Sequence, residues 1–282
     1  MYNFYWKRKF LKPFVFIFGN NIGQNILFKI SEIIQYLQGY GSGDLTEYSG
    51  EGAVVSRIDK SKRKKLVIFD IGSNIGQFIE LSKKNIKNND FEIYSFEPLN
   101  DCFEILKKKY SRDHKVNLNK LALGEKRNKQ ALYFDHKTSG SASLIQFNPQ
   151  NSEKMNYKQT VNTDTIDNYL SKNNITYIDL LKLDIEGSEL NALRGAKKTF
   201  SEAKIRSVLF EFGGQGISPR NFIYDFYNFF TEYQYDFYRL TPSGYLKKIE
   251  RYNSSDEVFK CTNYLAVLSE DTIIMNNRES HN

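Results

Sequence analysis

The stretch "LVIFDIGSNIG", residues 66–76, joins the end of a predicted strand to the turn that follows it. Leu66 to Phe69 are typical of a buried strand, and Asp70 puts an acid where the apolar run would otherwise continue. Gly72 and Gly76 then leave two positions of the turn without side chains. Glycine adopts positive φ readily and exposes bare backbone. The turn therefore fits either a tight connection alone or a bound small molecule that contacts the backbone.

Apolar strand segments alternate with helical segments from residue 66 onward. Two closing strands follow each other without a helix between them, which predicts an antiparallel addition at one edge of a sheet. Strands that are apolar on both faces and alternate with helices predict an α/β fold, with a mostly parallel sheet and helices on both faces. The predicted strands are 66–72, 91–98, 116–124, 130–136, 178–187, 207–214, 235–249 and 262–268, and the predicted helices are 75–86, 100–110, 164–173, 188–200 and 219–233.

Residues 1–60 are predicted to form an N-terminal helical extension, residues 61–270 the main domain, and residues 271–282 a polar tail. The extension is assigned because residues 21–38 carry apolar side chains at three- and four-residue steps, before "GYGSGD" (39–44) breaks the pattern.

Composition limits the class of protein. The chain has 282 residues, of which 40% are hydrophobic, and this supports a folded core. Its net charge of +7 indicates either a solvated basic surface or attraction to an acidic partner, such as a phosphorylated glycan, a membrane surface or nucleic acid. Cys102 and Cys261 are the only cysteines, which excludes a disulfide framework and favours the cytoplasm. The three histidines have no metal-ligand spacing.

The first twenty residues carry a basic stretch followed by the apolar run Phe14 to Phe18. This run is far shorter than the roughly 20 residues of a membrane-spanning helix. No small-residue cleavage pattern follows it, which argues against a signal peptide. Three interpretations stay open: a helix packed on the main domain, a peripheral contact with the inner membrane, and a homodimer contact.

A doubly wound sheet binds ligands beyond the carboxyl ends of its strands, where Asp70, Gly72, Asn74 and Gly76 fall. The pattern G-x-N-x-G lacks a glycine of the dinucleotide motif GxGxxG. Glu97 closes the next strand, 97 − 76 = 21 residues after Gly76, where a carboxylate can accept both ribose hydroxyls of an adenosine. Asp70 either holds the loop amides or meets an ammonium group. These features predict a site for S-adenosylmethionine.

Five segments resemble the FkbM family of S-adenosylmethionine-dependent methyltransferases, in family order, over about residues 66–213. They are "FDIGSNIGQF" (69–78), "SFEP" (95–98), "LALG" (121–124), "LLKLDIEGSELNALRGA" (180–196) and "LFEF" (209–212). The resemblance implies a Rossmann-like, seven-stranded class I methyltransferase fold with a reversed final strand. It also implies O-methylation of a hydroxyl on a sugar or polyketide.

The same resemblance assigns roles by position. Asp184 is implied to face the methyl group, and Ser73 is a small departure from the commoner GANIG. Leu121 and Ala122 are implied to lie near the adenine. The residues implied to line the cofactor are Asp70, Gly72, Ser73, Asn74, Gly76 and Glu97.

Lys182 and Asp184 stand two residues apart in a predicted strand, so their side chains leave the same face. They form either a structural ion pair or a site that binds or deprotonates the acceptor hydroxyl. Glu211, at the end of another strand, and His136, before the loop "KTSGSASL", are further candidates for the catalytic base. The carboxylates could instead hold a divalent metal, although we predict no metal ligand. Ser188 is expected to cap the next helix.

Two other functions account for parts of the sequence. A nucleic-acid methyltransferase fits the basic patches, but "NPQN" (148–151) is not the [DN]PP[YFW] signature, and the aromatics of 221–230 have the spacing of core residues. A non-catalytic cofactor-binding or scaffold protein would keep the fold without turnover, but the intact residues Asp70, Gly72, Gly76, Glu97 and Asp184 argue against such decay. The prediction is therefore an O-methyltransferase whose acceptor is a small molecule, a cell-surface glycan or a related natural product, acidic acceptors included.

Overall fold

The computed structural model describes residues 2–43, 46–60, 63–138, 140–146 and 155–271. The chain divides into two compact units, Met1–Gln38 and Gly39–Asn282. The main unit thus begins at Gly39 and not near residue 61. The reason is helix α3 (Glu51–Asp59), whose Val54, Val55 and Ile58 are buried in the core of the main unit. Most of the predicted polar tail, and "NPQN", lie outside the described residues.

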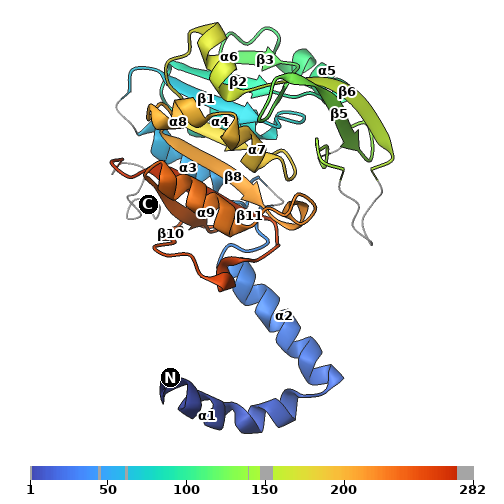
Figure 1. Ribbon diagram of the computed structural model, residues 1–282, viewed down its shortest axis with the longest axis vertical. Coiled ribbons are helices and arrows are strands. Elements are labelled where there is room, and N and C mark those ends of the chain that lie inside the picture. Colours follow the sequence, from blue (N-terminus) through green and yellow to red (C-terminus); the bar gives the residue numbers. More distant parts are fainter. Residues whose placement is uncertain (1, 44–45, 61–62, 139, 147–154, 272–282) are drawn as a thin grey trace. The chain divides into compact units, whose positions relative to one another are not determined.

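The main unit is built on an eight-stranded sheet with the order β10-β9-β11-β8-β7-β1-β2-β3 (Figure 1). From β8 to β3 the neighbouring strands are parallel, whereas β11 runs antiparallel to both β8 and β9, and β10 antiparallel to β9. The strands are β1 (Leu66–Ile71), β2 (Phe91–Phe96), β3 (Val116–Asn119), β7 (Leu180–Leu183), β8 (Ser207–Phe212), β9 (Tyr235–Leu240), β10 (Leu246–Lys248) and β11 (Thr262–Leu268).

The eighth strand, β10, exists because a turn divides a segment that was predicted as a single strand. Residues 235–249 were predicted as one strand, but Gly244 has φ +79° and donates its N–H to the carbonyl of Thr241 at 2.8 Å. Thr241 and Ser243 close this turn through their hydroxyls, 3.0 Å apart. The segment therefore folds into the β9–β10 hairpin, and the predicted reversed strand is β11.

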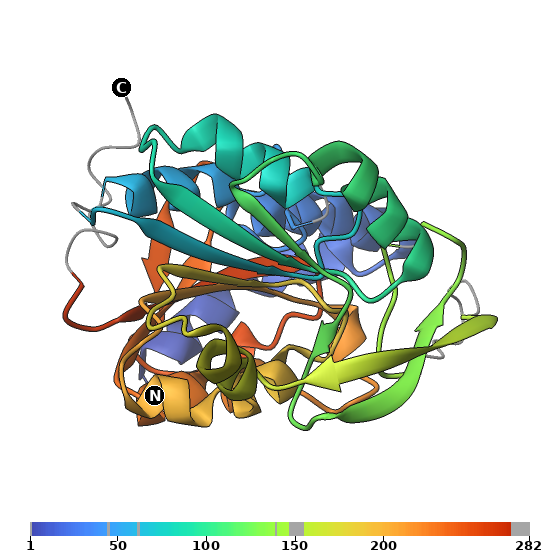
Figure 2. The same cartoon turned by 90° about the horizontal axis from the view of Figure 1, so that it is seen from above.

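Helices cover both faces of this sheet (Figure 2). One face packs α3 and α4 (Gln77–Asn85) with α5 (Asn100–Tyr110) over one set of strand residues. The other face packs α6 (Ile166–Asn173), α7 (Glu189–Arg194), α8 (Lys197–Ser201) and α9 (Ile223–Glu232). Alternate residues of the same strand supply the two cores, as Ile68 and Phe69 of β1 do.

A small second sheet with the order β4-β6-β5 supports one side of the site (Figure 1). Its strands are β4 (Ala122–Leu123), β5 (Asn128–Phe134) and β6 (Tyr157–Asp164). The sequence analysis missed β6, because most of its side chains are polar and several are exposed. Tyr133 of β5 exchanges two backbone hydrogen bonds with Ser143, at 2.8 and 2.9 Å, which ties the loop of residues 140–146 to this sheet.

The N-terminal unit consists of two helices, α1 (Tyr2–Phe18) and α2 (Asn21–Leu37). Asn20 caps α2, and its side chain accepts a hydrogen bond from the N–H of Gly23 at 2.9 Å. A Cβ at Gly23 would approach Phe18 Cα to 2.6 Å, so glycine permits the close junction of the two helices. None of the helices in the described residues has the length and hydropathy to span a lipid bilayer.

Candidate functional site

The turn after β1 takes its shape from its neighbours. Gly72 has φ +86°, and a Cβ there would lie 1.8 Å from the backbone oxygen of Asp184. Gly76 has φ +94° and begins α4, and a Cβ there would lie 2.8 Å from the Tyr110 ring. Both glycines are therefore required by packing and backbone geometry. The turn brings Asp70 and Asn74 to the carboxyl end of the sheet.

Glu97 follows β2 and connects the two adjacent turns. Its Oε2 accepts the N–H of Asn74 at 2.8 Å, and its Oε1 accepts the N–H of Leu99 at 2.8 Å. Burial raises the pKa of Glu97 to about 7, although the two backbone N–H groups oppose that rise. Each carboxylate oxygen keeps a further lone pair, so Glu97 can still accept hydrogen bonds from a ribose.

Asp70 is a buried carboxylate whose partners are incomplete. Its side chain is 1% exposed, and its Oδ2 has no hydrogen-bond partner among the described residues. Burial raises its pKa to about 7, against the opposing charge of Lys182, its cross-strand neighbour on β7. A buried acceptor of this kind next to a cavity is a place where a cationic ligand group gains a partner.

Two cavities meet at the carboxyl end of the sheet. The first is mostly apolar, and the second is a polar cavity of about 330 Å³. Both are lined by Gly72, Asn74, Gly140 and Asp184, so these residues mark the junction. Of the predicted cofactor residues, Glu97, Leu121 and Ala122 line the first cavity, Asp70 and Ser73 line the second, Gly72 and Asn74 line both, and Gly76 lines neither.

Lys182 is a buried cation in the lining of the polar cavity. It is 3% exposed, and its Nζ lies 3.0 Å from Asp184 Oδ2 and 3.3 Å from Glu51 Oε1. Burial lowers the pKa of Lys182, but the surrounding carboxylates, Asp184 first, outweigh it and raise the pKa overall. The predicted ion pair is therefore present, and α3 supplies a second carboxylate to it. The sequence analysis missed Glu51, whose signal is an acid directly before an apolar helical run.

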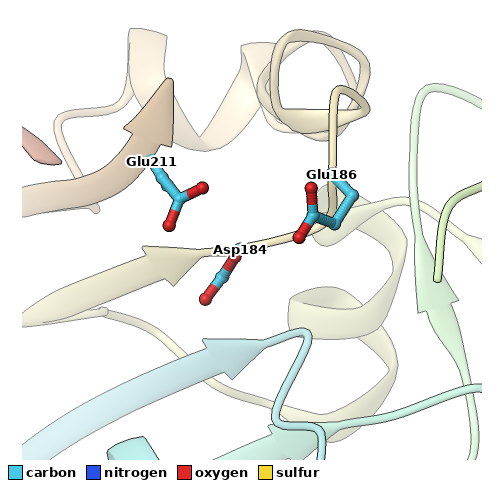
Figure 3. A group of neighbouring side chains, drawn as sticks. All are labelled: Asp184, Glu186 and Glu211. Carbon is cyan, nitrogen blue, oxygen red and sulfur yellow. The ribbon is translucent and has the colours of Figure 1, made fainter. Parts of the chain in front are cut away.

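Three carboxylates gather beside Lys182. One oxygen each of Asp184, Glu186 and Glu211 lies within 4.8 Å of the others, and the three side chains converge from β8 and the turn after β7 (Figure 3). Burial, and then the charge of Asp184, raises the pKa of Glu211 to about 8 and raises that of Glu186 as well. This oxygen set could accept hydrogen bonds from hydroxyls or hold a hard divalent cation.

Glu186 belongs to the functional residues that the sequence analysis missed, and Glu189 holds its turn in place. Glu189 Oε1 accepts the N–H groups of Ile185 at 3.0 Å and Gly187 at 3.2 Å. The expected cap by Ser188 is wrong, since its hydroxyl makes no side-chain cap bond at α7. The Glu189 side chain instead holds the turn before α7, and Glu186 of that turn lines the polar cavity.

His136 lies apart from these residues. Its side chain is 59% exposed, and its Nδ1 lies 2.8 Å from Asp135 Oδ1. It lines neither of the two cavities. The structure thus brings Lys182, Asp184 and Glu211 together and leaves the fourth predicted catalytic residue outside.

Comparison with known proteins gives a family match over much of the chain. Residues 70–237 match the family model described as Methyltransferase FkbM domain. No curated protein matches the sequence.

Solved structures resemble the chain at low identity. Methyltransferase FkbM from Methylobacillus flagellatus KT is 17% identical with a TM-score of 0.46; the match covers 72% of this chain and 44% of that one, so this chain spans less than half of its length. SMU.1697c from Streptococcus mutans, in complex with SAH, is 9% identical over 77% of this chain and 97% of that one, with a TM-score of 0.41. Precorrin-6y C5,15-methyltransferase from Geobacter metallireducens GS-15 is 7% identical, with a TM-score of 0.39. The match covers 77% of this chain and 86% of that one.

Proposed function

This chain belongs to the FkbM methyltransferase family, and on that premise we propose that it transfers a methyl group from S-adenosylmethionine to a hydroxyl of a sugar or cell-surface glycan. Its main sheet has the class I methyltransferase arrangement, extended by strand β10 to eight strands. The observation that carries the proposal is the cluster of Asp184, Glu186 and Glu211 in the polar cavity.

The residues present fit the proposed cofactor. Its ammonium group would meet Asp70, whose buried Oδ2 has no partner in the described part of the chain. Its ribose would meet Glu97, and its adenine would enter the apolar cavity beside Leu121 and Ala122. When bound, S-adenosylmethionine supplies an electrophilic methyl group on a sulfonium. The protein is then left with three tasks, namely alignment, exclusion of water and removal of a proton.

Asp184 is placed to act on the acceptor hydroxyl. It is one of four residues that line both cavities, so its carboxylate stands where the cofactor side and the acceptor side meet. Lys182 holds Oδ2 of this carboxylate at 3.0 Å, and this contact fixes the side chain in place. We assign Asp184 as the group that accepts the hydroxyl proton, while Lys182 acts as a positioning residue.

Glu186 and Glu211 supply further acceptors beside the reacting hydroxyl. A sugar presents neighbouring hydroxyls a few ångströms apart, each of which needs an acceptor when it leaves water. Three carboxylates within 4.8 Å of one another meet that need. This match favours O-methylation of a polyhydroxyl compound.

The charge of the polar cavity argues for a neutral acceptor group. Among the described residues, its lining carries one ammonium group, that of Lys182, against five carboxylates. Burial raises the pKa of Glu51, Asp70, Glu186 and Glu211, so these groups are partly protonated near neutral pH, and the ionised fraction would repel a phosphate or carboxylate at the reacting end of the acceptor. The same repulsion acts against a nucleic-acid strand, whose backbone carries a negative charge at every nucleotide. We therefore narrow the acceptor to a neutral polyol at the point of transfer. The five carboxylates are Glu51, Asp70, Asp184, Glu186 and Glu211.

The test is transfer of radiolabelled methyl from S-adenosylmethionine to a panel of neutral methyl glycosides, hexuronic acids and tRNA. We expect label in a neutral glycoside, as an ether that survives alkali. Label confined to tRNA, or to the acidic sugars, contradicts the proposal. Binding of the cofactor with no label in any acceptor favours the scaffold function instead.

A further inference from the structure

The N-terminal unit exposes most of the large apolar side chains on the described surface of this protein. Of the 21 that are exposed, 15 lie between Phe10 and Leu37, and six are spread over the rest of the described chain. Soluble proteins rarely expose contiguous apolar patches of this kind unless the patch contacts a partner or a membrane. None of these 15 residues lines either of the two cavities.

Helix α1 is apolar around its whole circumference in its second half. Phe14, Val15, Phe16 and Ile17 are consecutive, and their exposed fractions are 46%, 65%, 77% and 62%. Because successive residues of an α-helix are turned by about 100°, four in a row point in all directions. A protein partner covers one side of a helix, whereas lipid chains surround it. A helix that is apolar all round is typical of burial in a core or a membrane.

Helix α2 is amphipathic and has a definite polar side. Ile22, Ile26, Ile30, Ile33 and Leu37 fall within an arc of about 80°, and Leu27 and Ile34 widen it to about 140°. Asn21, Gln24, Asn25, Ser31, Glu32 and Gln35 occupy the opposite side, and Phe28 is the one apolar side chain among them. A helix of this design lies in the plane of a lipid surface, with one face in the acyl region and the other in water.

The charges of the unit complement an anionic surface. Residues 1–38 contain five basic residues and a single acid, Glu32. Four of the basic residues lie between residues 7 and 12, directly before the apolar run, and α1 contains no acid. Basic residues next to a membrane-inserted segment are attracted by the negative potential of anionic lipids. An interface between two copies of this unit would instead bring these positive charges together.

We propose that α1 and α2 form a membrane-binding hairpin that inserts into the interface of an anionic lipid bilayer. The second half of α1 and the apolar side of α2 enter the acyl region, and residues 7–12 contact the headgroups. This proposal stands without the methyl-transfer proposal, because it rests on the N-terminal unit alone. Together, the two place the enzyme at a membrane surface, where a lipid-linked glycan would be presented to it.

The test is co-sedimentation of the full chain with vesicles of phosphatidylglycerol and phosphatidylcholine in equal parts. We expect the chain to pellet with these vesicles and to bind pure phosphatidylcholine about tenfold less tightly. Ile17→Glu, at a position 62% exposed, is expected to weaken binding by about tenfold or more. The matched control is Ile217→Glu, at a position 57% exposed in the main unit, which should bind as the wild type does.

Fluorescence gives a second readout on the same samples. The chain has a single tryptophan, Trp6, within α1, so its emission should shift to shorter wavelength with anionic vesicles. Three outcomes overturn the proposal. The first is a wild-type chain that stays in the supernatant, and the second is an equal loss of binding in both variants. The third is a dimer in solution that does not bind vesicles and that Ile17→Glu dissociates.

Discussion

At the scale of single residues, the site is built from carboxylates that are costly to bury. Asp70, Glu97 and Glu189 are almost completely buried, and burial raises the pKa of each to about 7. Glu97 and Glu189 accept two backbone N–H groups each, which explains how they are tolerated. Asp70 lacks such a complete set, so its charge needs a ligand. From this difference we expect Glu189 to serve the fold, Glu97 to serve both the fold and the cofactor ribose, and Asp70 to meet the ammonium group of the cofactor.

Asp70→Asn is expected to make the unliganded protein more stable and to weaken its binding of S-adenosylmethionine. At pH 8 the wild-type carboxylate is ionised, because its pKa is about 7, and the isosteric amide removes that buried charge. We expect a gain of about 1–2 kcal/mol in the free energy of unfolding. S-adenosylmethionine should bind at least about tenfold less tightly, since its ammonium loses the opposing charge. Thermal unfolding with and without cofactor measures both effects, and a variant that is less stable yet binds normally contradicts this role.

Asp184→Asn is expected to keep cofactor binding and lose transfer. The amide fills the same volume but cannot take the hydroxyl proton, so the rate should fall by about 10²–10⁴-fold. His136→Asn is the matched control, because His136 lines neither cavity, and its rate should stay near that of the wild type. Steady-state transfer and calorimetry measure the two properties separately. Turnover of Asp184→Asn at the wild-type rate refutes the assignment of the base.

At the scale of elements, the β1 turn shows how much the sequence could predict. The strand, the following helix and the positions of Asp70 and Glu97 follow from local pattern, and the structure confirms their order. The packing that requires Gly72 could not be predicted, because the neighbouring atom is the backbone oxygen of Asp184, which follows β7 far along the chain. The role of Glu51 could not be predicted for the same reason, because only the folded chain brings α3 beside Lys182.

Gly72→Ala is therefore expected to damage the fold itself. A methyl group would lie 1.8 Å from a backbone oxygen at φ +86°, so we expect a loss of about 2–4 kcal/mol in the free energy of unfolding. Gly140→Ala is the matched control in the same cavities, because its nearest neighbour would be Asn74 Nδ2 at 3.6 Å. Chemical denaturation of both variants makes the comparison. Equal stability of the two would mean that β1 and β7 do not pack as described.

At the scale of the whole molecule, the protein collects acids at the end of one sheet and apolar side chains on a separate N-terminal unit. The sequence predicted the sheet, but the number of strands and the division at Gln38 depended on tertiary contacts: a glycine turn inside residues 235–249 and the burial of α3. The proximity of Glu186 and Glu211 could not be predicted either, because the two residues come from different elements that only the folded chain brings together. Together these acids make stability depend on pH.

The free energy of unfolding of the unliganded protein is expected to fall as pH rises from about 4 to about 8. In the native state the pKa is raised from 3.8 to about 7 for Asp70, from 4.5 to about 7 for Glu97 and from 4.5 to about 8 for Glu211. The native state therefore binds more protons than the unfolded state in this window, and deprotonation opposes folding. Urea unfolding at several pH values measures the slope. Stability that rises across the window contradicts the burial of these acids.

The most direct test of the central claim is a calorimetric titration of the full chain with S-adenosylmethionine, compared with NAD. That claim is our proposal that the two cavities at the end of the sheet take a nucleoside carrying an ammonium group, with Asp70 on one side and Glu97 on the other. We predict one binding site per chain for S-adenosylmethionine and no heat with NAD, because the turn 72–76 lacks the glycine pattern of a dinucleotide site. Absence of heat with S-adenosylmethionine, or tighter binding of NAD, would contradict this account.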